Sequence, residues 1–404
     1  MASIKLQGDN SGTLTIEAPS DAGNNTITLP ATSSTLATQN ALGVRNLIIN
    51  GDMRIAQRGT SVSGIVGGGA SGIYQTVDRF KTYMYNGSPS GQSGTWTQTQ
   101  DTDVPSGQGF SYSLKMQCTT AQASLHTDAY ARITQAFENQ MVQHLKYGTS
   151  TAEKITLSFW VKSNKTGTYI VELNGPGRIC NSYTIDTADT WEKKIWIVDA
   201  NQISTIANDN LSGLYLQFWI VAGSTYTSGT LPTTWSNSTT SADRAVGQVN
   251  LADSTSNYIN ITGVQLEVGD TATPFEHRPY DMELLRCQRY FCSSFPQGVA
   301  PANGLDISIA TTFSAYDNTT GWSPQMFFPV SMRAAPTMTA YKDNAGSTDG
   351  QWTTYDSGYT SLTSTTLSTS DKTTGFYCNG SRSSAFSAHN SYLLRGNFTA
   401  DAEL

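Results

Sequence analysis

The chain has 404 residues, of which 14% are charged and 10% aromatic, and its formal net charge is −7. This length allows more than one domain with its own core, and the excess of acidic residues gives no electrostatic basis for binding nucleic acid. No apolar run approaches the roughly 18 residues of a membrane span, and MASIKLQGDN lacks the apolar segment of a secretory signal, so we expect synthesis in a cytosol.

The first 45 residues are rich in turns and contain two short stretches with strand character. SGTLTIEAP, residues 11–19, and NNTITLPAT, residues 24–32, each alternate apolar and hydroxyl side chains for a few positions. Neither stretch is long enough to bury a sheet face by itself. We therefore expect β-segments in residues 1–45 that need neighbours, either from other copies of the chain or from a partner protein.

From residue 46 onward the strand pattern becomes stronger. In ITLSFWVKS, residues 155–163, apolar side chains occupy every second position, which indicates a strand with one buried face. Further strands are expected at residues 168–174, 191–199, 214–223 and 258–269. Many short strands, few helical patterns and loops rich in Gly, Ser and Asn predict a mainly β chain with a β-sandwich at its centre.

The expected strand at residues 214–223 is apolar on nearly both faces, so both faces should be covered. A sheet face with Trp160, Tyr215 and Trp219 offers aromatic rings, which sugar-binding sites combine with polar side chains. Its continuous apolar surface suits burial between subunits better than a hydrated sugar site. We therefore predict that these three residues lie at a subunit interface.

Residues 276–294 concentrate charged side chains in a chain that otherwise has few of them. After Pro279, Asp281 can cap a helix on which apolar side chains form one stripe. Such a short helix has to dock on another surface, and we expect it to pack on the same helix of neighbouring subunits. A catalytic cluster is disfavoured, because each carboxylate has an arginine nearby that tends to lower its pKa. The interface residues predicted here are Leu284, Arg286, Arg289 and Phe291.

Residue types of common catalytic and metal sites do not cluster in the sequence. The four histidines lie far apart without HxH or HExxH spacing, and no GxSxG motif occurs. The five cysteines are an odd number without CxxC spacing, so we expect reduced thiols rather than a disulfide framework or a zinc site. We expect a protein that binds without catalysis.

The last hundred residues contain a second candidate surface for sugars. YKDNAGSTDGQWTTYDSGYTS, residues 341–361, mixes aromatic rings and carboxylates with Gly and Ser. Loops of this composition suit binding, because rigid rings supply contact area and small polar groups supply adaptable hydrogen bonds. Residues from two neighbouring segments can join them. The predicted ligand-binding residues are Trp322, Asp349, Trp352, Tyr355, Asp356, Tyr359 and Tyr377.

Several segments resemble known protein families. NLIINGDM (46–53), LSFWVKS (157–163) and ITGVQLEVG (261–269) are similar to the jelly-roll domains of carbohydrate-binding modules. The chain resembles tail fibre proteins of tailed bacteriophages in longer segments: NLIINGDMRIAQRGT, DRF, QLEVGDTATPFEHRPYDMELLRCQRYF, GTLTIEAPSDAGNNTITLPATSSTLAT, FFPVSMRAAPTMTAY and NFTADAEL. Each segment alone is moderately specific, and their common order over most of the chain makes the resemblance strong.

The resemblance implies a homotrimer in the virion tail, made in the host cytoplasm. Residues 1–45 would attach it to phage tail or adaptor proteins and help it trimerise, 46–275 would form a jelly roll, 276–294 a short neck helix and 295–404 a small C-terminal β-domain as receptor-binding tip. Its expected partners are further copies of the chain and a host surface glycan or outer-membrane receptor. Neither nucleic acid binding nor membrane insertion is expected.

Carbohydrate-binding jelly rolls often hold a structural calcium ion near their first and last strands. Asp52 and Glu267 offer oxygen ligands at those places. Gly263 stands where the family usually has an acidic residue, so two ordinary surface carboxylates are the other interpretation. We expect no other cofactor.

Two alternative functions stay open at the level of sequence. A head fibre or decoration protein of the virion would have a similar composition. A depolymerase that cuts capsular polysaccharide would need a pair of carboxylates about 5 to 10 Å apart. No repeat period indicates the long parallel β-helix that is common among such enzymes.

Overall fold

The computed structural model describes the backbone of residues 3–7 and 13–17, and residues 45–404 except 68–71, 86–91, 238–239, 306, 344–348, 356–357, 371, 384 and 388. The chain divides into two compact units, Met1–Leu42 and Gly43–Leu404. In the first unit, β1 (Ser3–Gln7) pairs antiparallel with β2 (Thr13–Glu17). Strand β2 lies within SGTLTIEAP, whereas the strand expected in NNTITLPAT falls outside the described residues.

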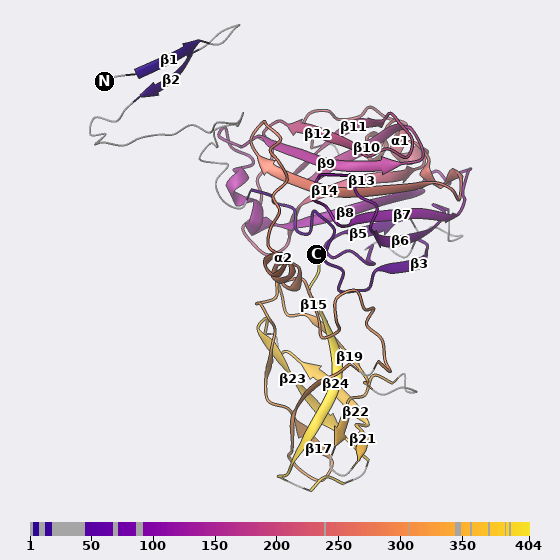
Figure 1. Cartoon of the computed structure of the whole chain (residues 1–404), viewed down its shortest axis with the longest axis vertical. Helices are drawn as coiled ribbons and strands as arrows, with labels where there is room; N and C mark the ends of the chain where they lie inside the picture. The colour runs from indigo at the N-terminus through magenta and orange to yellow at the C-terminus, as the bar shows by residue number, and fades with distance from the viewer. Residues whose placement is uncertain are drawn as a thin grey trace. The chain divides into compact units, whose positions relative to one another are not determined.

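Two six-stranded antiparallel sheets, labelled in Figure 1, form the first part of the unit Gly43–Leu404. Sheet I has the strand order β11-β10-β13-β8-β5-β4, and sheet II has the order β12-β9-β14-β7-β6-β3. The chain crosses repeatedly from one sheet to the other, for example from β7 to β8 and on to β9. This connectivity, with a shared core between the sheets, is typical of a jelly-roll β-sandwich. The mainly β fold and the β-sandwich are confirmed.

Sheet I consists of β4 (Ile73–Tyr74), β5 (Lys81–Met84), β8 (Tyr130–Glu138), β10 (Gly167–Gly175), β11 (Gly177–Ile185) and β13 (Ser212–Ala222). Sheet II consists of β3 (Ser61–Ile65), β6 (Thr95–Asp101), β7 (Ser113–Thr120), β9 (Ile155–Ser163), β12 (Glu192–Val198) and β14 (Tyr258–Val268). Short helices between them are η2 (Asn139–Leu145), α1 (Ser224–Thr227), η3 (Ser241–Asp243) and η4 (Leu251–Asp253). The five strands expected from the sequence correspond to β9, β10, β12, β13 and β14.

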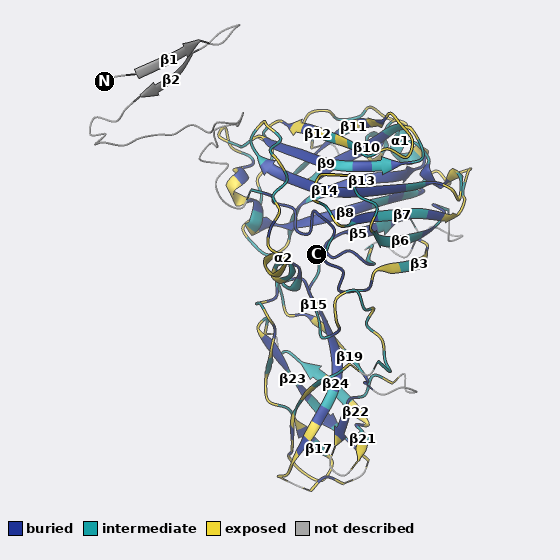
Figure 2. Ribbon diagram, in the orientation of Figure 1, coloured by how far each residue is buried: buried dark blue, intermediate teal, exposed yellow. Residues whose placement is uncertain are grey.

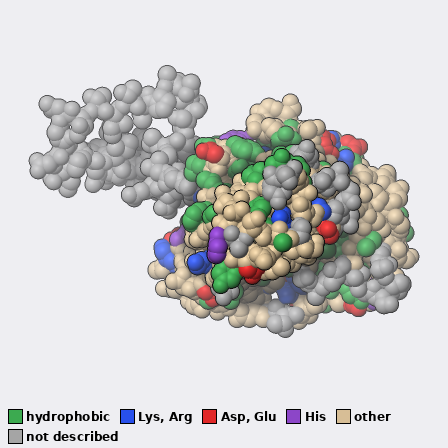
Figure 3. All heavy atoms as spheres, turned by 90° about the horizontal axis from the view of Figure 1, so that it is seen from below, with side chains coloured by type: hydrophobic (Ala, Val, Ile, Leu, Met, Phe, Trp, Pro, Cys, Tyr) green, Lys and Arg blue, Asp and Glu red, His purple; other side chains and the backbone are tan. Residues whose placement is uncertain are grey.

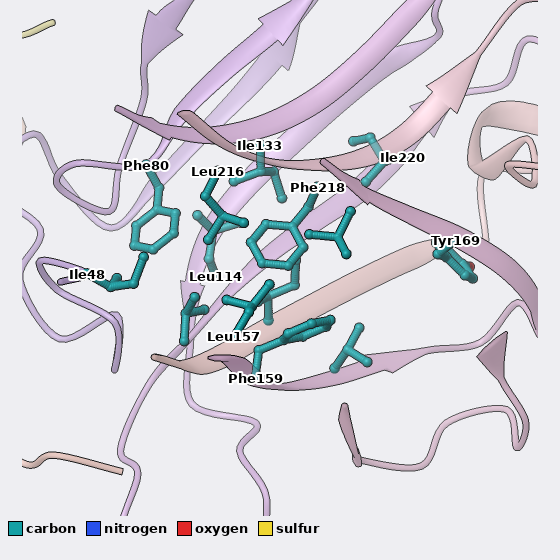
Figure 4. Close-up of a cluster of buried hydrophobic side chains, with 14 of the residues drawn as sticks. Ile48, Phe80, Leu114, Ile133, Leu157, Phe159, Tyr169, Leu216, Phe218 and Ile220 are labelled. Atoms are coloured by element: carbon teal, nitrogen blue, oxygen red, sulfur yellow. The ribbon is translucent and has the colours of Figure 1, made fainter. Parts of the chain in front are cut away.

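The alternating pattern of β9 explains how the sandwich core is built. Leu157 and Phe159 are buried and point into the space between the sheets, where they meet Phe218 of β13 (Figure 4). The rings of Phe159 and Phe218 are 5.0 Å apart, edge to face. Complete burial of one such side chain stabilises a fold by roughly 1.5–3 kcal/mol. In Figure 2 the central strands β8, β9, β13 and β14 are accordingly dark blue over much of their length, whereas β3 is largely yellow.

Helix α2 (Tyr280–Gln288) follows the sandwich and docks on residues near the start of the sandwich. The Glu283 carboxylate accepts a hydrogen bond from the backbone N–H of Asn50 and is paired with Arg278 at 3.2 Å. Cys287 is fully buried in a small cluster with Ile49 and other apolar side chains. The buried face of the helix therefore packs on its own chain, and packing on the same helix of neighbouring subunits stays a prediction.

A buried ion pair connects the end of this helix to sheet I. Glu138, the last residue of β8, has a fully buried side chain. Arg289 donates to both of its carboxylate oxygens, at 2.8 and 2.7 Å. Tyr290 and Gln140 each donate a further hydrogen bond to Glu138 at 2.5 Å. These four hydrogen bonds, from three side chains, satisfy a carboxylate that would otherwise be costly to bury.

The C-terminal residues contact sheet I as well. Arg79 is fully buried, is paired with Glu403, and stacks on the ring of Tyr290 at 3.4 Å. Lys81 of β5 and Tyr74 of β4 donate to the main-chain oxygen of Leu404 at 3.0 and 3.2 Å. The last residues of the chain are therefore held against the sandwich.

The remaining strands form a third sheet of this unit, the C-terminal sheet, in which the long strand β24 takes the central place (Figure 1). Its strands are β15 (Phe291–Ser293), β16 (Ile309–Ala315), β17 (Thr320–Trp322), β18 (Met326–Phe327), β19 (Thr337–Tyr341), β20 (Thr353–Tyr355), β21 (Tyr359–Ser361), β22 (Ser364–Ser368), β23 (Gly375–Ser381) and β24 (Ser391–Asp401). Phe313, Trp352, Phe376 and Leu394 belong to a core of its own, separate from the sandwich core. The division of the chain at residues 275 and 294 stays a prediction.

Candidate functional site

Large apolar side chains are exposed on the outer face of the C-terminal sheet. Tyr355 of β20 lies opposite Leu393 of β24, and Tyr359 of β21 lies opposite Tyr355. Side chains that oppose one another across antiparallel strands project to the same side of a sheet. The three residues are 42% to 55% exposed, and the rings of Tyr355 and Tyr359 are 4.9 Å apart. They form one continuous row at the surface.

A second aromatic pair lies on the same side. Trp322 of β17 is opposite Ser314 of β16, and Ser314 is opposite Ser391 of β24. Ser391 is two residues from Leu393, so Trp322 and Leu393 project in the same direction. Trp322 is 46% exposed, and its ring contacts that of Tyr316 edge to face at 5.7 Å. We call Tyr316, Trp322, Tyr355, Tyr359 and Leu393 the aromatic face.

Polar contacts fix the Tyr359 end of the aromatic face. Arg395 donates from Nη1 to the Tyr359 hydroxyl at 2.6 Å, and its Nε lies 3.2 Å from Oδ2 of Asp343. Asp343 is only 4% exposed and also accepts a hydrogen bond from the Thr353 hydroxyl at 3.1 Å. A ring that is already held in one position loses less conformational entropy when a ligand binds.

The surroundings of the aromatic face are polar, and hydroxyl groups are prominent among them. Thr312, Ser314 and Ser391 are exposed between the aromatic residues on the same side of the sheet. In Figure 3, which views the unit Gly43–Leu404 from the end that is lowest in Figure 1, hydrophobic side chains are interspersed with backbone and polar side chains, with a few charged side chains between them. Rings for apolar contact next to hydroxyl groups for hydrogen bonding are the combination that a sugar requires.

The other predicted ligand-binding residues have different environments. Trp352 is fully buried, and its indole N–H donates to the Asn397 carbonyl at 3.0 Å, so this ring belongs to the core and cannot contact a ligand. Tyr377 is half-buried on β23. Asp349 is exposed, 3.7 Å from Lys342, and Asp356 lies outside the described residues. Of the seven predictions, the structure brings together Trp322, Tyr355 and Tyr359.

A groove of about 710 Å³ lies elsewhere on the C-terminal sheet, over strands β19, β24 and β15. Arg58, which precedes the first strand of sheet II, forms part of its wall together with Arg333. The guanidinium group of Arg58 stacks on the ring of Phe291 at 3.6 Å. Carboxylates of Asp401 and Glu403 lie 3.5 and 3.3 Å from Nη2 of Arg58. Sequence reasoning did not identify this groove, because its residues come from distant segments.

Two of the residues predicted at a subunit interface are used inside the chain. Trp219 is fully buried: its indole N–H donates to Glu172 at 2.8 Å, and its ring contacts Tyr226 at 5.4 Å. The outer face of β13 is thus covered, as expected, but by the chain's own residues after β13. Phe291 is likewise buried, under Arg58. The partly exposed residues Trp160, Tyr215, Leu284, Arg286 and Arg289 stay predictions for the interface.

The two candidate calcium ligands each have protein partners. Asp52 is paired with Arg54 at 2.8 Å, and burial raises the pKa of its carboxyl group. Glu267 accepts hydrogen bonds from the backbone and hydroxyl groups of Thr273 at 2.9 and 2.6 Å. Among the described residues, no group of three or more His, Cys, Asp or Glu side chains could hold a metal ion. Gly263 has φ 60°, and a Cβ there would lie 2.6 Å from Phe110, so packing explains this glycine.

Comparison with known proteins gives limited structural likenesses only. No protein-family model matches the chain, and no curated protein matches it in sequence. The enzymatically active domain of bacteriophage CBA120 tailspike protein 4 is similar over 55% of this chain, with 13% identity and a TM-score of 0.28. The match covers 21% of the tailspike chain.

Two carbohydrate-binding structures are similar over comparable parts of the chain. TmCBM61, in complex with β-1,4-galactotriose, aligns with 56% of this chain and 99% of its own, at 10% identity and a TM-score of 0.25. A family 11 carbohydrate-binding module from Clostridium thermocellum, in complex with a mixed-linked tetrasaccharide, covers 54% and 99% at 11% identity and a TM-score of 0.22. Likenesses at these scores carry no functional argument. Within the described part of the chain, no helix is long and apolar enough to cross a membrane.

Proposed function

We propose that the protein is an adhesin of the phage tail fibre type, which binds a glycan on the host surface through the aromatic face. The observation that carries this proposal is the exposure of Trp322, Tyr355 and Tyr359 on one side of the C-terminal sheet. Monomeric proteins normally bury such rings or expose them singly, and contiguous exposed patches commonly mark interaction sites. The sequence segments that resemble phage tail fibres also support it.

Recognition would combine ring contacts with hydrogen bonds. The aromatic rings offer flat apolar surfaces to the apolar faces of pyranose rings, and the exposed hydroxyl groups of Thr312 and Ser391 lie within the same surface. The hydrogen bond from Arg395 holds the Tyr359 ring in position before the ligand binds. Single sites of this kind can be weak, because several copies on one particle raise the effective affinity by orders of magnitude.

The proposal includes a homotrimer in the virion, with residues 1–45 attached to the tail. Self-association is supported by apolar side chains on the outward face of α2: Met282 and Leu285 are 45% and 42% exposed, and Tyr280 before them is 44% exposed. Because the helix already buries its other face on its own chain, this exposed face is available to further copies. Analytical ultracentrifugation of the full chain tests this part: a stable monomer at micromolar concentration would contradict it.

We further propose that the protein binds without cleaving its ligand. Arg395, which donates to the Tyr359 hydroxyl, is ion-paired with the buried carboxylate of Asp343, and Asp317, next to Tyr316, accepts hydrogen bonds from the backbone N–H groups of Thr319 and Thr320. A catalytic acid requires a protonated group near neutral pH, and the backbone hydrogen bonds from Thr319 and Thr320 lower the pKa of Asp317 to about 2. Release of reducing ends from host polysaccharide by the purified protein would contradict this part.

The decisive experiment compares host-cell binding by the full-length protein and by variants with one ring removed. Trp322→Ala and Tyr359→Ala should each weaken binding at least tenfold, which corresponds to the loss of one interaction of about 1.4 kcal/mol or more. Ile195→Ala and Ile197→Ala serve as matched controls, because these residues of β12 are 53% and 50% exposed but lie on the sandwich. Unchanged binding of both ring variants would refute the aromatic face as the site. Equal binding to host and non-host cells would favour a head fibre or decoration protein.

A further inference from the structure

The groove of about 710 Å³ on the C-terminal sheet has a floor of regularly spaced polar side chains. Thr337, Thr339 and Tyr341 are alternate residues of β19, and Thr399 and Asp401 are alternate residues of β24. In the register Thr337 is opposite Asp401, and Thr339 is opposite Thr399. All five side chains therefore project from one face of the sheet into the groove.

Several of these groups have hydrogen-bonding capacity that the described residues do not use. Thr337 and Thr339 are exposed, and their hydroxyl groups have no partner among the described side chains and backbone groups. The Asp401 side chain is 48% exposed; Oδ1 accepts the backbone N–H of Glu403 at 3.0 Å, and Oδ2 lies 3.5 Å from Arg58. The floor thus offers hydroxyl groups that can donate or accept, next to a carboxylate that accepts.

The charges that line the groove are balanced and already engaged. Arg333 donates to three backbone carbonyls, those of Ala402, Asn210 and Glu403, at 2.7 to 3.0 Å. Arg58 faces the carboxylates of both Asp401 and Glu403. Two arginines therefore match two carboxylates, and neither guanidinium group is free to bind an anion. This balance favours an uncharged ligand.

The floor is a sheet face, and this fact decides between a peptide and a sugar. A ligand that lies on the face of the sheet, and not along its edge, meets side chains instead of backbone groups, so an extended peptide cannot add there as a further strand. Recognition has to use side chains. Closely spaced hydroxyl groups with one carboxylate complement the vicinal hydroxyl groups of a pyranose, and the half-buried Tyr341 ring at one end supplies apolar contact.

We propose that this groove is a second binding site, for a neutral saccharide, separate from the aromatic face. Thr337, Thr339 and Asp401 would hydrogen-bond the sugar, and the volume of about 710 Å³ lies within the range of known small-ligand sites. The inference rests on the proposed function in that both sites would serve glycan binding. The groove and the aromatic face use different residues, so failure of the groove proposal can be recognised separately from failure of the proposed function.

The test titrates the full-length protein with maltotriose, cellotriose and chitotriose by calorimetry or NMR. Thr337→Val combined with Thr339→Val keeps the shape of both side chains and removes both hydroxyl groups, and it should weaken binding of the preferred trisaccharide at least tenfold. Asp401→Asn should weaken it as well. Thr184→Val is the matched control, because Thr184 is an exposed strand threonine on β11 of sheet I.

The outcomes separate the two sites. Loss of trisaccharide binding in the threonine variant, with Trp322→Ala unaffected, supports the groove. Loss only in Trp322→Ala overturns the groove and leaves the adhesin proposal standing. Absence of binding by the wild-type protein to all three sugars, or equal binding by wild type and the threonine variant, also overturns the groove. Circular dichroism of each variant excludes unfolding as the cause of a loss.

Discussion

Replacing Arg289 by Met should destabilise the unit Gly43–Leu404, because it removes the cation that faces a buried carboxylate. The Glu138 side chain is 0% exposed, whereas that of Arg289 is 29% exposed. Removing one member of a buried pair costs about 3–5 kcal/mol. Because Arg289 is partly hydrated and Tyr290 and Gln140 still donate to Glu138, we expect a lower cost of about 2–3 kcal/mol.

The effect should depend on pH in a defined direction. Burial raises the pKa of Glu138, but the hydrogen bonds from Arg289 and Tyr290 outweigh it and lower the pKa below its ordinary value of 4.5. A carboxyl group whose pKa is lower in the folded state contributes stability above its unfolded pKa and loses it as pH falls through the folded value. The difference between wild type and Arg289→Met should therefore be full at neutral pH and shrink below about pH 4.5.

Urea unfolding followed by tryptophan fluorescence measures this difference. Arg286→Met is the matched control: it removes the same charge three positions earlier, and Arg286 is half-buried without a hydrogen bond to any described residue. A double variant, Glu138→Gln with Arg289→Met, should lose less stability than the two single changes together, because the pair is removed as a unit. Equal unfolding midpoints for Arg289→Met and Arg286→Met would refute the reasoning.

Burial raises the pKa of Asp78 to about 6. The stability that this carboxyl group contributes is therefore present below its unfolded pKa of 3.8 and is lost as pH rises through 6. Asp78→Asn should remove this dependence, so urea unfolding should show a flatter plot of stability against pH between about pH 4 and 6. Gly396→Ala should destabilise by about 1–3 kcal/mol, because a Cβ there would lie 2.3 Å from the Trp352 ring, whereas Gly358→Ala, with open space around it, should be neutral in thermal melts. The five cysteines are free and buried, so a thiol reagent should react with them only after unfolding.

Local sequence patterns were sufficient for the sandwich strands. The strand predicted at residues 155–163 coincides with β9, because apolar residues at every second position mark the face of a strand that packs on a core. The helix after Pro279 was also recognisable from the sequence, but the part of the chain on which it packs was not. Glu138 and Arg289 are 151 positions apart, and no local pattern indicates that distant charged residues will be buried together.

Aromatic residues near the C-terminus show where composition alone misleads. Trp352 and Tyr355 belong to the same short segment, yet one is fully buried and the other is 42% exposed. Three-residue strands such as β20 are too short for alternation to separate an inward ring from an outward one. Leu393 was not predicted as a surface residue of the site, although the sequence carried a signal for it. It lies between Tyr392 and Leu394 on β24, which both point inward, and this alternation places Leu393 on the outer face.

The groove also bears on the choice between glycan binding and glycan cleavage. Asp401 and Glu403 both lie within 3.5 Å of Nη2 of Arg58, so they are at most about 7 Å apart, within the range of glycosidase carboxylate pairs. Distance alone is not sufficient, because one member of such a pair has to carry a proton near neutral pH. Glu403 is paired with both Arg58 and Arg79, and Arg58 also faces Asp401. Carboxylates held by arginines in this way can accept hydrogen bonds from a sugar, which is the role proposed for Asp401, and release of reducing ends by the purified protein would show that the pair also cleaves one.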